Sequence, residues 1–338
     1  MTFVDDFSKI LPGNLVDWLH TLNTKELTEI LLHVGSFPAV RFGKKLWDSL
    51  DDGTEKYITT QTDIDSIVCN LPKFNQKNRA AMDARLHRVS AIRNVDNKII
   101  GLTIRVGKDF PGLANIFKDL LEGADNIIII SPPGLGKSSI LRDISRLVAE
   151  ELHQHVCVID YTNELAGNGD VPHPSVGPCT RFQVPVGKTM ADVMLEAVEN
   201  HNPDVVICDE ISTYNDVRSA QSIAARGVKL IATAHGVGVD SLLNNPVLKH
   251  LAGNVSVVTL GDSEMKTRDL DTKNVTEREL PPTFSCAIEI KDFDNYNVYR
   301  DLETVIDALL AKKAVVPEKR LRHKDGTFAV LCKQSISN

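Results

Sequence analysis

The feature that most constrains the fold of this 338-residue chain is residues 126–139, which read NIIIISPPGLGKSS. Four consecutive isoleucines predict a buried strand, and a glycine-rich loop then leads into Lys-Ser and an amphipathic helix. A strand, a loop and a helix in this order around Gly-Lys-Ser are typical of the phosphate-binding P-loop. A strand this apolar needs neighbours that cover both of its faces. The motif therefore predicts an α/β fold with a mostly parallel sheet.

The residues of this loop have separate expected roles. The two glycines let the backbone direct its N–H groups at a phosphate. The lysine reaches the β- and γ-phosphates, and the hydroxyl of Ser138 is a ligand for Mg²⁺. Ser131 replaces the first glycine of the usual motif, which weakens the match slightly. The expected nucleotide-binding residues of the loop are Pro133, Gly134, Leu135, Gly136, Lys137, Ser138 and Ser139.

Two adjacent carboxylates follow a second apolar run, residues 205–208. We expect Asp209 to hold Mg²⁺ together with Ser138, and Glu210 to polarise the attacking water. Ligands bind at the carboxyl ends of the strands in an open parallel sheet, which is where this pair would lie. Together with the phosphate loop, the pair predicts ATP and Mg²⁺ as cofactors and ATP hydrolysis as the reaction.

Other strand ends supply further candidates. Glu164 follows an expected strand at residues 156–160 and is a second candidate base, although Asp160 and Glu164 could equally cap the next loop. His235 follows another expected strand, where it either contacts the γ-phosphate or has only a structural role. A surface arginine is more often solvated than catalytic. The arginines that could reach a phosphate are Arg88, Arg93, Arg105, Arg181 and Arg226.

The chain divides by its patterns into four parts. Residues 1–108 are expected to form a smaller N-terminal α+β domain. Residues 109–262 alternate apolar strands with amphipathic helices, which predicts the P-loop core. Residues 263–312 are expected to extend this core. Residues 313–338 are expected to be a basic, flexible tail.

Particular elements can be placed within these parts. Apolar periodicity predicts a helix over residues 15–34 and a second helix over residues 62–71. A hairpin is expected from residues 89–92 and 99–106, which flank a polar turn. Residues 255–260 are expected to be the last strand of the core.

Composition excludes several classes of protein. The chain is 42% apolar and 25% charged, as globular proteins are, and no run approaches the about 18 apolar residues of a membrane span. The start of the chain, with Asp5 and Asp6, is unlike a signal or transit peptide. Six widely spaced cysteines predict reduced thiols and no zinc site. The net charge of −7 argues against a surface coated for nucleic acid, although residues 312–338 hold seven basic and two acidic side chains.

Several segments together resemble a known family. They read ISPPGLGKSSILRDISRLVAEEL, VIDYTNELAGNGDVPHPSVG, DVVICDEIS and RGVKLIATAHG, within a similarity over about residues 10–312. The chain resembles a group of plastid and cyanobacterial AAA-type ATPases that is similar to stage III sporulation protein AA and to the secretion and pilus traffic ATPases. The resemblance implies a P-loop NTPase core of the RecA/AAA type. It also implies a homo-oligomeric ring, usually a hexamer, in the plastid stroma or the bacterial cytoplasm.

The same resemblance implies residue roles. Residues 160–164 match the acidic box of the traffic ATPases, in which a glutamate assists hydrolysis, and His235 matches their histidine box. In those ATPases an N-terminal domain folds over the nucleotide and its arginines contact phosphates. That favours Arg105 and Arg93 among the arginine candidates, and Arg105 is expected among the nucleotide-binding residues.

The C-terminal end departs from the family pattern. Relatives carry a nucleic-acid-binding module named for an arginine and a histidine separated by three residues, whereas Lys319 occupies the arginine position before His323 here. The leading expectation is an ATP-hydrolysing protein that acts as a ring-forming motor or assembly ATPase. The alternative is a nucleotide-gated nucleic-acid-binding protein with little turnover, whose basic tail contacts phosphate backbones.

Overall fold

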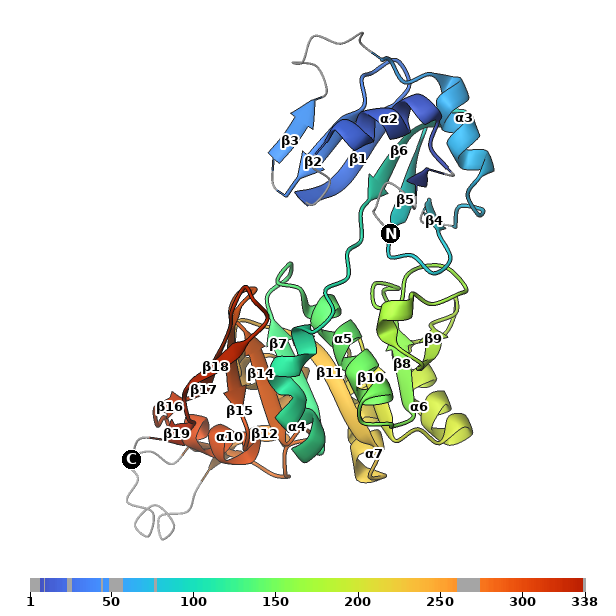
Figure 1. The fold of residues 1–338 in the computed structure, drawn as a ribbon. Coiled ribbons are helices and arrows are strands. Elements are labelled where there is room, and N and C mark those ends of the chain that lie inside the picture. Colours follow the sequence, from blue (N-terminus) through green and yellow to red (C-terminus); the bar gives the residue numbers. More distant parts are fainter. Residues whose placement is uncertain are drawn as a thin grey trace. The chain divides into compact units, whose positions relative to one another are not determined.

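The computed structural model describes residues 7–8, 10–22, 26–43, 45–48, 57–75, 78–259 and 274–336. The chain divides into two compact units (Figure 1). The first unit holds residues 1–109 and 166–174, and the second holds residues 110–165 and 175–338. Residues 166–174 therefore belong to the first unit, although the sequence pattern alone assigned them to the P-loop core.

The described residues of the first unit form six antiparallel strands and two helices. The strands are β1 (Leu27–His33), β2 (Ala39–Phe42), β3 (Lys45–Asp48), β4 (Arg79–Ala81), β5 (Arg88–Arg93) and β6 (Ile99–Arg105). Their order in the sheet is β3-β2-β1-β6-β5-β4. Helices α2 (Gly13–Thr21) and α3 (Gln61–Cys69) bury Leu19 and Ile64 in one core with the sheet. An antiparallel sheet with helices is the α+β architecture expected for this part.

The expected helix over residues 15–34 is wrong in its second half. Helix α2 ends at Thr21, and residues 27–33 form strand β1 instead. This strand lies between β2 and β6, so both of its edges are hydrogen-bonded. Its side chains Leu27, Ile30 and Leu32 are all buried. The spacing of the apolar residues fits a helix or a strand, and strand pairing on both sides favours the strand.

The other two expectations for this unit are confirmed. Helix α3 begins at a capping box, in which Thr60 and Asp63 exchange side-chain and backbone hydrogen bonds. Strands β5 and β6 form the expected antiparallel hairpin. Its turn contains Asn97 at a φ of 66°, a left-handed conformation that asparagine tolerates better than most residues.

The second unit is built on a nine-stranded sheet. Its strands are β7 (Ile127–Ser131), β8 (Val156–Asp160), β9 (Thr180–Gln183), β10 (Val205–Cys208), β11 (Lys229–His235), β14 (Cys286–Ile290), β15 (Asn295–Tyr299), β17 (Glu318–Arg322) and β18 (Phe328–Cys332). The order is β18-β17-β15-β14-β7-β11-β10-β8-β9. Strands β14 through β9 in this order are parallel, and β15, β17 and β18 are antiparallel additions at one edge. The mostly parallel α/β core expected from the sequence is therefore confirmed.

Helices and short turns cover both faces of this sheet. They are η2 (Leu113–Phe117), α4 (Lys118–Gly123), α5 (Lys137–Glu150), α6 (Met190–His201), α7 (Tyr214–Ala225), α8 (Asp240–Asn244), η4 (Leu248–His250) and α10 (Leu302–Leu310). Strand β7 contributes side chains to two hydrophobic cores, one on each face of the sheet. Ile127 and Ile129 pack with α4 and α5, whereas Ile128 and Ile130 pack with α6, α7 and α10. Alternate side chains of a strand point to opposite faces, so this run must be apolar throughout. Among the helices of the residues listed above as described, none is long and apolar enough to cross a bilayer.

The residues beyond 262 supply more of the sheet than we expected. Strand β14 lies between β7 and β15 and runs parallel to β7, so a strand expected in an extension is central to the core. In Figure 1 the orange and red strands continue the sheet beyond the green strand β7. By contrast, β12 (Val255–Thr259), expected as the last strand of the core, pairs with β13 (Asn274–Arg278) in a separate two-stranded sheet. Residue 260 lies outside the described residues.

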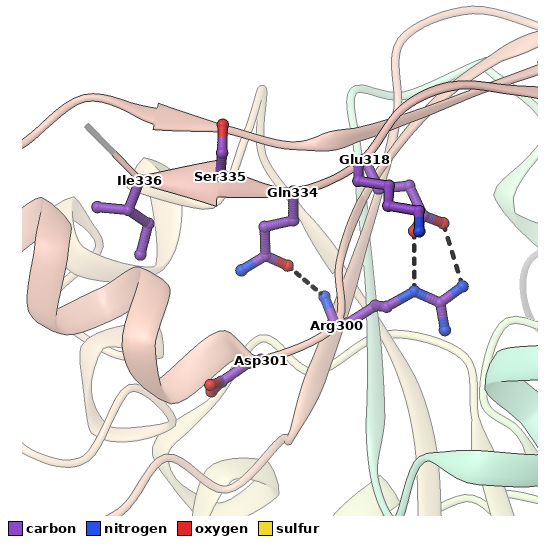
Figure 2. Close-up of a pocket in the computed structure, with 7 residues that line it drawn as sticks. Arg300, Asp301, Glu318, Gln334, Ser335 and Ile336 are labelled. Carbon is purple, nitrogen blue, oxygen red and sulfur yellow. Dashed lines mark hydrogen bonds and ion pairs between the residues drawn. The ribbon is translucent and has the colours of Figure 1, made fainter.

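The segment expected to be a flexible tail forms strands as far as residue 336. Strands β17 and β18 extend the main sheet, and β16 (Val315–Val316) pairs with β19 (Ser335–Ile336). Arg320 is only 1% exposed, and its guanidinium pairs with Asp119 and Glu318. Figure 2 shows Arg300 bonded to the same glutamate and to Gln334 beside a pocket at this edge. Two of the seven basic side chains of residues 312–338, Arg320 and Arg322, pair with acidic groups, whereas the five lysines are exposed.

Candidate nucleotide-binding site

The strand register brings the predicted site residues to one edge of the sheet. Ser131 at the end of β7 lies directly opposite His235 at the end of β11. Cys208 at the end of β10 is level with Ile159 of β8 and with Ala232 of β11. The residues that follow these strands therefore emerge together at the carboxyl edge, which is where parallel sheets bind ligands.

The phosphate loop has the backbone that its glycines predicted. Gly134 and Gly136 have φ values of 82° and 84°, in the left-handed region that favours glycine. A Cβ atom at Gly134 would have no heavy atom within 4 Å, so the glycine is needed for its backbone conformation and not for space. Ser131, which replaces the first glycine of the motif, is the last residue of β7 and is fully buried. Its strand conformation does not require glycine, and its hydroxyl donates to the Pro132 carbonyl.

A chain of three side chains crosses the site. Lys137, the first residue of α5, places its ammonium 2.8 Å from Nδ1 of His235. Nε2 of His235 lies 2.9 Å from a carboxylate oxygen of Glu210. An imidazole with its proton on Nε2 satisfies both contacts, because Nδ1 then accepts from Lys137 and Nε2 donates to Glu210. Burial lowers the pKa of the Lys137 ammonium, and the carboxylates of Glu210 and Asp209 act in the opposite direction.

Asp209 is a buried carboxylate at the centre of a cluster of acidic groups. It is 6% exposed, and its pKa is raised to about 6. Burial is the largest cause, and the nearby carboxylates of Asp160, Glu164 and Glu210 raise it further. The hydroxyl of Thr162 donates to the Asp209 carboxylate and acts in the opposite direction. Such a cluster is stabilised when a cation is bound beside it.

These residues fit a magnesium–nucleotide complex. Mg²⁺ prefers a few carboxylate and hydroxyl oxygens together with water and phosphate oxygens. Asp209 supplies a buried carboxylate, and Ser138 supplies a hydroxyl in the first turn of α5. The beginning of this helix carries unpaired N–H groups and a favourable dipole for phosphate. The chemistry of the donors therefore matches the expected cofactors.

The loop after β8 is held by residues that the sequence motifs did not identify. Arg142 of α5 is buried, and its guanidinium donates to the main-chain oxygens of Glu164 at 2.7 Å and Leu165 at 2.6 Å. The buried carboxylate of Asp160 accepts from the Leu165 N–H at 3.1 Å. The sequence analysis gave no role to Arg142 or to Thr162, although Thr162 lies inside the acidic box. The structure thus gives Asp160 a loop-stabilising contact and keeps Glu164 within the electrostatic reach of Asp209.

The arginine candidates lie on separate elements of the two units. Arg226 follows α7 and precedes β11, and it pairs with Glu199 at 3.1 Å. Arg226 precedes β11, which is seven residues long, and His235 ends it. Arg226 therefore lies roughly 20 Å from His235, at the end of the sheet where the parallel strands begin. Arg181 lies on the edge strand β9, level with Val158. Arg105 ends strand β6 of the first unit.

Among the remaining arginines of the first unit, Arg93 has a local structural role. Its guanidinium donates to the side-chain oxygen of Asn78 and to the main-chain oxygen of Asn97, both at 2.7 Å. These bonds stabilise the β5–β6 turn, so this arginine is engaged within its own unit.

Solved structures of other proteins share this fold. The ATPase DotB of Legionella pneumophila matches with a TM-score of 0.54 and 14% identity over 90% of this chain and 85% of that chain. The pilus retraction motor PilT with bound ADP matches with a TM-score of 0.56 and 14% identity over 88% of this chain and 85% of that chain. The fold is therefore that of the P-loop secretion ATPases.

Sequence comparison then identifies the family. Residues 86–260 match the family described as sporulation stage III, protein AA, and the chain belongs to this family. It is 40% identical to SEEDLING PLASTID DEVELOPMENT 1 of Arabidopsis thaliana, over 95% of this chain and 46% of that protein. It is 39% identical to the ycf45 protein of Porphyra purpurea, over all of this chain and 59% of that protein. It is 37% identical to the ycf45 protein of Cyanidium caldarium, over 84% and 83% of the two chains. The chain thus spans about half the length of the first two relatives.

Proposed function

We propose that this chain binds ATP with Mg²⁺ and hydrolyses it. The observation that carries the proposal is the Lys137–His235–Glu210 chain beside the buried Asp209, at the carboxyl edge of the sheet. A lysine for phosphate, an acid for the metal and an acid for water are the parts that P-loop hydrolysis requires. The fold shared with DotB, an ATPase, and with PilT, a motor with bound ADP, supports the same reaction.

The residues of this chain would divide the work as follows. The loop N–H groups and Lys137 bind and orient the β- and γ-phosphates. When bound by Ser138 and Asp209, Mg²⁺ supplies positive charge that neutralises charge on the transferred phosphate. Glu210 orients the attacking water and accepts its proton. His235 joins the lysine to the glutamate, so phosphate binding at Lys137 changes the contact that positions Glu210.

Point variants test the binding and hydrolysis roles separately. Lys137→Ala should lose ATP binding, measured by equilibrium titration, because the loop then lacks its phosphate-binding cation. Glu210→Gln should bind Mg-ATP normally but release phosphate about 100-fold or more slowly. Glu164→Gln is the matched control, since it removes one neighbouring carboxylate of the same cluster. Normal turnover by Glu210→Gln with a slow Glu164→Gln would move the base to Glu164. Failure of the wild-type protein to bind Mg-ATP would refute the function.

We further propose that the protein acts as a homo-oligomeric ring, hexameric as in the traffic ATPases it resembles, and drives movement or assembly in a plastid. The name of the Arabidopsis relative supports the plastid setting. Arg226 lies too far from the phosphate loop of its own chain, so it could serve only the nucleotide of a neighbouring subunit. Arg181 and Arg105 remain candidates for the same contact. Light scattering with ATP and the Glu210→Gln variant tests the ring, and a monomer under those conditions would contradict it.

The two arginines of the C-terminal segment, residues 312–338, give the nucleic-acid alternative no specific support. Arg320 is buried in ion pairs, and Arg322 pairs with Asp294 at 2.8 Å. Both arginines are therefore already neutralised by acids of the same chain. Because nonspecific nucleic-acid binding depends on cations that replace counterions, this pairing leaves five of the segment's seven basic side chains, all of them exposed lysines, for such a role.

A further inference from the structure

An exposed aromatic ring stands beside the phosphate loop, on a segment that no sequence motif marked. Phe293 lies in the turn between β14 and β15 and is 62% exposed. A Cβ atom built at Gly136 would lie 3.9 Å from Cε1 of Phe293, which is van der Waals distance. The ring therefore borders the last glycine of the loop, directly before Lys137.

The position of the acidic groups fixes the direction in which a nucleotide would lie. Glu210 follows β10 and His235 ends β11, and both strands lie on one side of β7. The terminal phosphate of ATP must face these residues if they are to orient water. The nucleoside end then points away from β11. The strand on the other side of β7 is β14, whose turn carries Phe293.

The turn that carries Phe293 is held in a fixed conformation. Oδ1 of Asp292 accepts the N–H groups of Asp294 and Asn295, each at 2.9 Å. The main-chain oxygen of Phe293 itself accepts from the Tyr296 hydroxyl at 2.8 Å. A ring on a fixed backbone loses little conformational entropy when a ligand stacks on it. This turn is thus pre-organised, although its phenyl ring is exposed to solvent.

The same hairpin is also fastened to the loop that follows His235. The buried Glu289 of β14 accepts the N–H of Val239 at 2.7 Å. Lys291 donates to the main-chain oxygen of Val237 at 3.2 Å and pairs with Glu289 at 2.9 Å. The two walls of the phosphate loop, one from β11 and one from β14, are therefore joined by direct hydrogen bonds.

We propose that Phe293 stacks on the base of the bound nucleotide and that the β14–β15 turn forms the base-binding wall of the site. The inference rests on the proposed nucleotide binding and adds the contact that would distinguish a nucleotide from bare polyphosphate. A phenyl ring offers a face to any base, and such stacking contributes affinity without hydrogen-bond readout.

Phe293→Ala tests the proposal by comparing two ligands. The variant should bind ADP about 5- to 100-fold more weakly than the wild type, the range expected for one lost stacking contact. It should bind inorganic tripolyphosphate with unchanged affinity, because the phosphate loop is intact. Phe328→Ala is the matched control, since Phe328 is a 46% exposed phenylalanine on β18 of the same sheet. It should bind both ligands like the wild type.

A second variant reports the contact directly. In Phe293→Trp, ADP should quench the added indole fluorescence and tripolyphosphate should not, with the wild-type protein as the background from Trp18 and Trp47. ADP affinity unchanged in Phe293→Ala, or an equal loss for both ligands, would overturn the stacking role while leaving nucleotide binding in place. If the wild-type protein binds neither ligand, the proposed function and this inference both fail.

Discussion

The Asp209→Asn substitution should stabilise this protein while it abolishes Mg²⁺-dependent hydrolysis. The carboxyl of Asp209 is 6% exposed, and its pKa is raised from 3.8 to about 6 by burial and by neighbouring carboxylates. A difference of about two pKa units corresponds to about 3 kcal/mol of disfavoured ionisation. Asparagine has nearly the same shape, keeps an oxygen that can accept from the Thr162 hydroxyl, and carries no charge.

The sign of this effect depends on pH in a definite way. A carboxyl whose pKa is higher in the folded state favours folding only while it is protonated. Ionisation of Asp209 therefore does not lower the free energy of unfolding below about pH 4. It lowers this free energy progressively as the pH rises to about 6, and the loss stays constant above that pH. The free energy of unfolding of the Asp209→Asn variant should exceed that of the wild type by about 2–3 kcal/mol at pH 7.5. The advantage should fall to about half at pH 5.

Urea-induced unfolding of the variant and of the wild-type protein across pH 5–8 measures this difference. Asp204→Asn is the control, because Asp204 is an exposed aspartate just before the other end of β10, where it accepts from the His155 N–H at 2.8 Å. That variant should show no gain in stability at any pH. An Asp209→Asn protein no more stable than the wild type at pH 7.5, or an advantage independent of pH, would refute the electrostatic reasoning. A functional acid that costs stability is expected at a catalytic site.

Three further outcomes follow from the structure. Gly134→Ala should destabilise the loop by about 1–2 kcal/mol and weaken ATP binding, because an alanine at a φ of 82° is strained even in open space; thermal unfolding and titration measure both, and wild-type values would contradict the strain argument. Arg320→Met should lower the free energy of unfolding by about 1.5–3 kcal/mol in urea, since it removes one of the two cations that pair with the buried Glu318 and leaves only Arg300; a neutral effect would mean that the C-terminal strands do not depend on this pair. Iodoacetamide should modify the exposed Cys69 in the native protein and leave Cys208 intact, because burial raises the pKa of that thiol and shields it; peptide mass spectrometry distinguishes the two, and early modification of Cys208 would show that the core opens.

Local patterns predicted the part of the site that lies in one continuous segment. The loop from Ser131 to Ser138 has its strand, its glycines and its helix next to each other in the chain, so each residue limits its neighbours. Asp209 and Glu210 were recognisable because a buried strand must end where polar residues begin. The sequence also indicated His235 as a strand-end residue, but its two contacts came only from the structure.

Local sequence patterns could not predict contacts between segments that are distant in the chain. The sequence patterns gave no role to Phe293, which lies far from the phosphate loop in the chain, or to Arg142, whose main-chain partners lie 22 and 23 positions later. The strand at residues 27–33 was misread as helix because its spacing fits both structures, and only pairing with β2 and β6 settled it. Arg320 looked solvated because one of the acids with which it pairs, Asp119, lies 201 positions earlier in the chain.

The sequence by itself determined a parallel α/β core with a phosphate-binding loop and an acidic strand end, because these features depend on adjacent residues and on the periodicity of burial. The tertiary structure decided which candidates meet. It joined Lys137, His235 and Glu210 in one chain, left Arg226 at the other end of the sheet, and turned the basic segment into strands. The physical reason is that register and ion pairing act between segments far apart in the chain, where no local pattern records the partner.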